Sequence, residues 1–113
     1  MNQPQYISVD SLCDEVESAG LAWADAKAAA EALEETRKSV LAQGMTSYFA
    51  EGLAANKAEA HALADQPYVA FLHNMVKARH TADRARVRYD ILRTRIELLR
   101  TNASTERAAM SMR

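Results

Sequence analysis

The chain contains few of the residues that interrupt helices or build compact catalytic loops. Its 113 residues include one cysteine, three glycines and two prolines, and aromatic residues make up only 6%. A single cysteine cannot form an internal disulfide, and so few glycines leave little for a loop that cradles phosphate. Ala, Leu, Glu and Arg are abundant instead, a balance typical of coiled coils and long helices. We therefore expect an all-α fold without a sheet.

Long hydrophobic runs are also missing. No apolar segment approaches the roughly 18 residues that a membrane-spanning helix needs. The first ten residues, MNQPQYISVD, do not show the basic and then apolar order of a signal peptide. We expect a cytoplasmic protein without a membrane partner. The spacing of Cys13 is that of a helix interior, which predicts a buried thiol.

Catalytic and metal-binding motifs are absent as well. The sequence has no nucleophile elbow, no CxxC pair and no HExxH motif. His73 and His80 are seven residues apart and do not form the i,i+4 pair typical of a helical metal site. Glutamates at positions 31, 34 and 35 lack the Glu-x-x-His partner of a di-iron bundle. The sequence predicts no enzyme activity, no cofactor and no metal.

Stop and start signals divide the chain into three helices within a single domain, residues 1–113. The first helix is expected over about 9–51, with Ser8 or Asp10 as its cap and Gly52 in a left-handed conformation at its end. A short connecting helix follows over about 54–64. The last helix begins near 66, where Asp65 can cap it, and runs to about 102 with the option of continuing to about 110.

Both long helices carry apolar residues at alternating spacings of three and four, the pattern of a coiled-coil seam. Two such seams joined by a compact connector predict a long, coiled-coil-like antiparallel helical hairpin. Gly20 and Gly44 interrupt the first helix, and the spacing leaves open whether they bend it. The predicted core of the hairpin or of its oligomer comprises Leu12, Val16, Trp23, Leu33, Leu72, Met75, Tyr89, Leu92, Ile96 and Leu99.

A lone two-helix hairpin buries little apolar surface, because many seam positions are alanine. Apolar residues are also left on the outer side of the last helix, including Val69, Val76, Val87 and Ile91. We therefore expect a homo-oligomer in which hairpins share a larger bundle core. A dimer and a higher assembly both remain open.

Charge is unevenly distributed. Residues 1–66 hold eleven acidic and four basic side chains, whereas residues 67–113 hold four acidic and ten basic ones. One interpretation is that the two helices neutralise each other across the hairpin. The other is that the basic side chains bind a nucleic acid backbone, because evenly spaced guanidinium groups can each neutralise a phosphate. The candidate residues form a first basic row, Lys77, Arg84, Arg88 and Arg95, accompanied by His73 and His80, and a second basic row, Arg79, Arg86, Arg93 and Arg100.

Three segments carry a resemblance to known proteins: RKSVLAQGMTSYFAEG at 37–52, AEAHALADQPY at 58–68 and RIELLRTNASTERAAM at 95–110. Through them the chain resembles small helical proteins encoded by bacteriophages. The order of a helix closing on Tyr48 to Gly52 and then a second long helix is also similar to the UvsY-type recombination mediators. Those proteins work as oligomers and help to load a recombinase on single-stranded DNA.

The resemblance implies a non-enzymatic accessory role in phage-type DNA recombination or replication, in the host cytoplasm if a phage encodes the chain. Its expected partners are single-stranded DNA, bound weakly through the basic rows, and a recombinase or annealing protein. A second function remains open: a protein-only adaptor or inhibitor that acts through helix–helix contacts.

Overall fold

The computed structural model describes residues 8–112, and these form three helices with no strand. The helices are α1 (Val9–Ala50), α2 (Ala55–Ala64) and α3 (Gln66–Ser111). The predicted all-α helical hairpin with a short connecting helix is confirmed. Helix α3 takes the longer of the two expected lengths, since no glycine or proline follows Pro67 to end it earlier.

The chain divides into two compact units. Among the described residues, unit 1 takes 8–24 and 83–112, and unit 2 takes 25–82. Each unit is built on a stretch of α1 and a stretch of α3, and unit 2 also contains α2.

Hydrogen bonds at both ends of α1 fix its limits where the sequence predicts them. At the start of α1, the Ser8 side-chain Oγ accepts a hydrogen bond from the backbone N–H of Ser11 at 3.0 Å, which makes Ser8 the cap. At its end, Gly52 adopts a φ of +89°, and the N–H groups of Gly52 and Leu53 donate to the carbonyls of Phe49 and Tyr48. This is the Schellman arrangement, which stops the helix and satisfies its last carbonyls.

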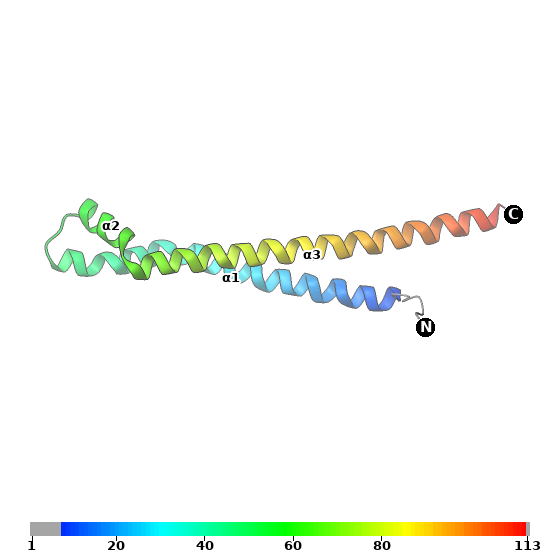
Figure 1. Ribbon diagram of the computed structural model, residues 1–113, viewed down its shortest axis with the longest axis horizontal. Coiled ribbons are helices and arrows are strands. Elements are labelled where there is room, and N and C mark those ends of the chain that lie inside the picture. The colour runs from blue at the N-terminus through cyan, green and yellow to red at the C-terminus, as the bar shows by residue number, and fades with distance from the viewer. Residues whose placement is uncertain (1–7, 113) are drawn as a thin grey trace, which may run out of the picture. The chain divides into compact units, whose positions relative to one another are not determined.

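In unit 1, the first half of α1 and the second half of α3 pack antiparallel (Figure 1). The buried centre contains Leu12, Ala19, Leu92 and Ile96, against which Val16 and Tyr89 pack. The rings of Trp23 and Tyr89 are tilted, with 5.5 Å between their centroids, so Trp23 also contributes to this core.

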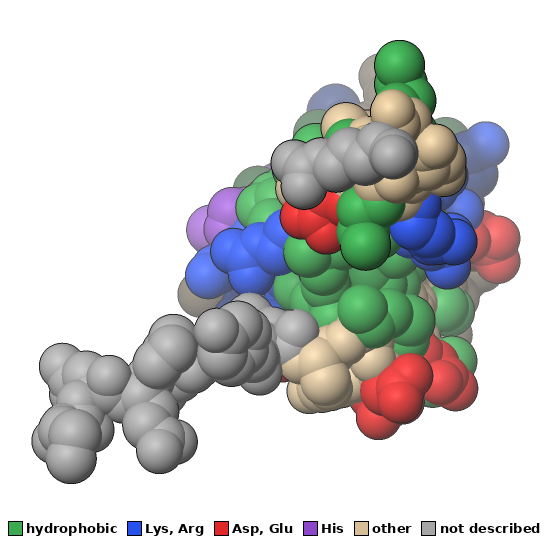
Figure 2. Space-filling model, turned by 90° about the vertical axis from the view of Figure 1, so that its right-hand side faces the viewer, with side chains coloured by type: hydrophobic (Ala, Val, Ile, Leu, Met, Phe, Trp, Pro, Cys, Tyr) green, Lys and Arg blue, Asp and Glu red, His purple; other side chains and the backbone are tan. Residues whose placement is uncertain are grey.

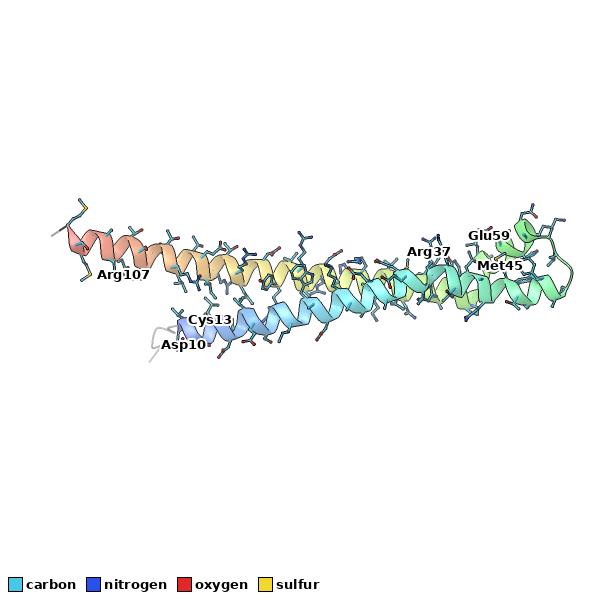
Figure 3. The ribbon with its side chains drawn as sticks, turned by 180° about the vertical axis from the view of Figure 1, so that it is seen from behind. Asp10, Cys13, Arg37, Met45, Glu59 and Arg107 are labelled. Atoms are coloured by element: carbon cyan, nitrogen blue, oxygen red, sulfur yellow. The ribbon has the colours of Figure 1, made fainter. Side chains whose placement is uncertain are left out.

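Two expectations for unit 1 are wrong. Leu99 is 41% exposed rather than buried. Gly20 of α1 lies against Tyr89 of α3, so in an antiparallel pair the start of α1 at Val9 lies about level with Leu99 and does not cover it. Cys13, near the start of α1 (Figure 3), is exposed rather than buried, because it lies beside the seam and not in it.

In unit 2, α2 lies against the part of α1 that carries Met45 (Figure 3). Small side chains permit this close approach: a Cβ placed on Gly44 would lie 3.6 Å from the Cβ of Ala62. The fully or almost fully buried residues of this unit are Ala30, Ala58, Ala62, Tyr68 and Ala82. The predicted core residues Leu33, Leu72 and Met75 are half-buried.

Polar contacts fix the corner between α1, α2 and α3. The Tyr48 hydroxyl lies 2.7 Å from both carboxylate oxygens of Asp65 and donates its proton to them. The Arg37 Nε donates to the Tyr68 hydroxyl at 3.1 Å. Asp65 precedes α3 in an extended conformation, as a cap residue does, and its carboxylate accepts a hydrogen bond from the Tyr48 hydroxyl. The side chain therefore ties the corner to α1.

Candidate nucleic-acid interface

Three arginines of the first basic row lie in unit 1 and are exposed. Arg84, Arg88 and Arg95 follow one another at spacings of four and seven residues, which places them on one side of α3. None of them forms an ion pair with a residue that the structure describes. Guanidinium groups in this state keep their donors available for an anionic ligand.

Acidic side chains of α3 lie on a different side of the helix from these arginines. Asp83, Asp90 and Glu97 repeat every seven residues and are exposed. Between the acidic and the basic flanks runs a partly apolar surface. A shallow hollow of about 360 Å³ on it is lined by Val87, Asp90, Ile91, Thr94 and Arg95. No carboxylate of α3 lies within this basic flank, formed by Arg84, Arg88 and Arg95. Arg88 shares a hollow of about 150 Å³ with Glu15 of α1, without an ion pair between them.

The second basic row is partly neutralised within α3. Arg86 pairs with Asp90 at 3.9 Å and Arg93 with Glu97 at 3.5 Å, both as exposed i,i+4 pairs. Exposed ion pairs such as these two are weak and exchange readily, so they reduce the charge offered by the second basic row without removing its donors. Figure 2 shows Lys and Arg side chains on both sides of a group of hydrophobic side chains.

In unit 2 each basic row contributes one residue, and the two differ in exposure. Lys77 of the first basic row is exposed. Arg79 is half-buried and makes a two-pronged contact with Glu34 of α1, with Nε–Oε1 at 2.8 Å and Nη2–Oε2 at 2.9 Å. The hydrogen bond from Arg79 holds the pKa of the Glu34 carboxyl below its ordinary value. Arg79 therefore takes part in the contact between α1 and α3, and a strand that binds it must displace Glu34. Its role in strand binding stays a prediction.

Aromatic side chains near the basic rows are engaged elsewhere. Tyr89 packs on Trp23, Tyr68 is 4% exposed and lies beside Phe71, and Tyr48 stacks on His61. Base stacking on these rings would require them to leave their packing partners. His73 and His80 are exposed, as a solvated basic face requires. The geometry therefore favours contacts to the backbone of a strand over contacts to its bases.

Sequence reasoning missed a groove at the seam of unit 1. It has a volume of about 400 Å³ and is lined by Cys13, Val16, Tyr89, Arg93, Ile96, Glu97 and Arg100. The seam residues Val16 and Ile96 were identifiable from their spacing, but the exposure of Cys13 was not. The signal that could have revealed the groove is the heptad position of Cys13, which flanks the seam on the same side as Arg93 and Arg100.

Comparison with protein-family models, with curated proteins and with solved structures finds no match to this chain. Among residues 8–112, no three His, Cys, Asp or Glu side chains are placed to hold a metal ion. No helix in the same range is both long and apolar enough to cross a membrane.

Proposed function

We propose that the chain is a non-enzymatic accessory protein of phage-type DNA recombination or replication, which binds single-stranded DNA weakly and contacts a recombinase or annealing protein. The observation that carries this proposal is the exposed basic flank of α3 in unit 1, formed by Arg84, Arg88 and Arg95 without an ion-pair partner in the described chain. The resemblance of the chain to UvsY-type mediators supplies the biological setting.

The arrangement suits a flexible single strand and affinity without sequence preference. Phosphate contacts fix a nucleic acid in place but carry no sequence information, which comes from contacts to base edges. The basic flank offers guanidinium groups, and the nearby aromatic rings are packed within the hairpin. Binding through three arginines is weak and falls with salt, because each phosphate contact releases counterions.

A second candidate function is a protein-only adaptor that acts through helix–helix contacts. It is favoured by the exposed apolar residues Val87, Ile91 and Leu98 on α3. In that case the chain binds a protein partner and leaves oligonucleotides unbound even at low salt.

Fluorescence anisotropy with a labelled oligothymidine of about 40 bases separates the two functions. At about 50 mM salt, the proposal predicts a saturable rise in anisotropy for the wild type and a strong loss of binding for Arg84→Glu with Arg88→Glu. A matched control reverses the exposed lysines Lys38 and Lys57 to glutamate, which changes the net charge by the same amount. The control should keep most of the binding.

Two outcomes contradict the DNA proposal. The first is the absence of any anisotropy change with excess protein at low salt. The second is equal loss of binding in the two double variants, because the effect would then follow net charge and not the basic flank. Circular dichroism of each variant confirms that the helices are intact before binding is compared.

A further inference from the structure

A second stripe at coiled-coil spacing runs along α3 on the side away from α1. Val87, Ile91, Thr94 and Leu98 recur at four, three and four residues. Each of these residues comes two positions after a seam residue of α3; those seam residues are Ala85, Tyr89, Leu92 and Ile96. Two residues turn an α-helix by about 200°, so this outer stripe lies opposite the seam. Val87 is 56%, Ile91 51% and Leu98 58% exposed, a large apolar surface for a helix already packed on its other side.

The charges beside the outer stripe follow the same heptad. With Ile91 and Leu98 at position a and Val87 and Thr94 at position d, Arg88 and Arg95 occupy position e. Asp83, Asp90 and Glu97 occupy position g. One flank of the stripe is thus basic and the other acidic. The shallow hollow lined by Val87, Ile91 and Thr94 has Asp90 on one side and Arg95 on the other, as this assignment requires.

This pattern is complementary to itself in only one orientation. In a parallel helix pair, a g residue of one chain meets the e residue five positions later in the other chain. Asp83 would then face Arg88 of the second copy, and Asp90 would face Arg95. In an antiparallel pair, e positions face e positions and g positions face g positions, so arginines would meet arginines and carboxylates would meet carboxylates. Charges at e and g determine the partner and its orientation, and juxtaposed like charges are costly.

The existing contacts of the acidic flank do not oppose such pairing. Asp90 and Glu97 are engaged only in the exposed i,i+4 pairs with Arg86 and Arg93 at 3.9 and 3.5 Å. In both pairs the cation precedes the carboxylate, which is the weaker order on a helix. These carboxylates can exchange or share their partners at little cost.

We propose that the occupant of the outer stripe is a second copy of this chain, bound in parallel through Val87, Ile91, Thr94 and Leu98, with Asp83 and Asp90 of each copy paired to Arg88 and Arg95 of the other. This dimer does not depend on DNA binding. It shares Arg88 and Arg95 with the candidate nucleic-acid interface, so a strand and a second copy compete for these two side chains.

Solution mass by light scattering at micromolar concentration, without DNA, tests the dimer. The wild type should have the mass of two chains, and Ile91→Asp the mass of one chain with its helix content retained. Arg95→Glu with Arg88→Glu leaves acidic groups on both flanks, and Asp83→Arg with Asp90→Arg leaves basic groups on both. Each double variant should dissociate about tenfold or more readily than the wild type, whereas an equimolar mixture should recover the two-chain mass.

A cysteine cross-link tests the orientation. In a Cys13→Ser background, Thr101→Cys places a thiol at the next d position of the outer stripe. In a parallel pair this thiol meets its own copy and forms an interchain disulfide on mild oxidation, whereas an antiparallel pair places it opposite residues near Arg84. A one-chain mass for the wild type, a larger assembly that survives Ile91→Asp, or a dimer that fails to cross-link at 101 would each overturn the proposal. Loss of oligonucleotide binding would not, because the mass is measured without DNA.

Discussion

Gly20 of α1 leaves room for the ring of Tyr89 on α3. A Cβ placed at Gly20 would lie 3.2 Å from Cε2 and 3.4 Å from Cδ2 of that ring. The same ring lies against Trp23, one helical turn further along α1. Gly20 lowers the intrinsic stability of α1 by about 1 kcal/mol relative to alanine, and the packing of the Tyr89 ring against it offsets this cost.

The three glycines should respond differently to alanine. Gly44→Ala should stabilise the fold by about 1 kcal/mol, because its new Cβ would meet Ala62 at an ordinary distance of 3.6 Å. Gly20→Ala should stabilise the fold clearly less, because the new Cβ would lie 3.2 Å from the ring of Tyr89, which must shift. Gly52→Ala should cost about 1–2 kcal/mol, because φ there is +89°. Chemical denaturation measures all three, and a gain at Gly20 equal to that at Gly44 would contradict the packing of Tyr89.

The hairpin register can be tested with two leucines on α3. Leu92→Ala removes a side chain that is 5% exposed and should cost about 2–4 kcal/mol. Leu99→Ala should cost less than about 1 kcal/mol, because that side chain is 41% exposed and lies level with the start of α1. Equal costs for the two substitutions would show that α1 covers α3 further along than the register allows.

Much of this fold follows from sequence, because a heptad seam constrains both the helix and its buried side. The spacing identified Leu12, Leu92 and Ile96, and Gly52 marked the end of α1 through the conformation that glycine favours. Leu99 continues the same spacing, and only the register of the two helices reveals that it lies level with the start of α1 and is left uncovered. Sequence could not separate Arg79 from the other arginines either, since its role depends on Glu34, which lies 45 residues away in the chain.

The contact between Tyr48 and Asp65 should give stability a specific dependence on alkaline pH. The Asp65 carboxylate accepts a hydrogen bond from the Tyr48 hydroxyl, and this hydrogen bond raises the pKa of Tyr48 above its ordinary value of 10.0. A raised pKa in the folded state contributes stability that is fully present below the unfolded value and is lost as pH rises through the folded one. Tyr48→Phe should lower the melting temperature at neutral pH and should remove this alkaline component.

Melting curves of the wild type and Tyr48→Phe over a range of pH values provide the measurement. The difference between the two proteins should shrink above about pH 10, where the hydroxyl of the unfolded chain loses its proton. A difference that stays constant through this range would mean that the Tyr48 hydroxyl does not donate to Asp65.

Cys13 should react with a maleimide in the folded protein. Its thiol is exposed, at the edge of the groove between α1 and α3 in unit 1. Labelling under native conditions should therefore be complete without denaturant, and urea should accelerate it only slightly. A thiol that reacts only after unfolding would instead agree with the burial expected from the sequence.

The salt dependence of strand binding tests the central claim most directly, namely that the basic flank of α3 holds a single strand through phosphate contacts. A contact to single-stranded DNA contributes about 0.7 to the slope of log affinity against log salt concentration. With contacts from Arg84, Arg88 and Arg95, the wild type should show a slope of about −2, and Arg84→Ala should reduce its magnitude by about 0.7. A slope near zero, or one that Arg84→Ala leaves unchanged, would contradict the account.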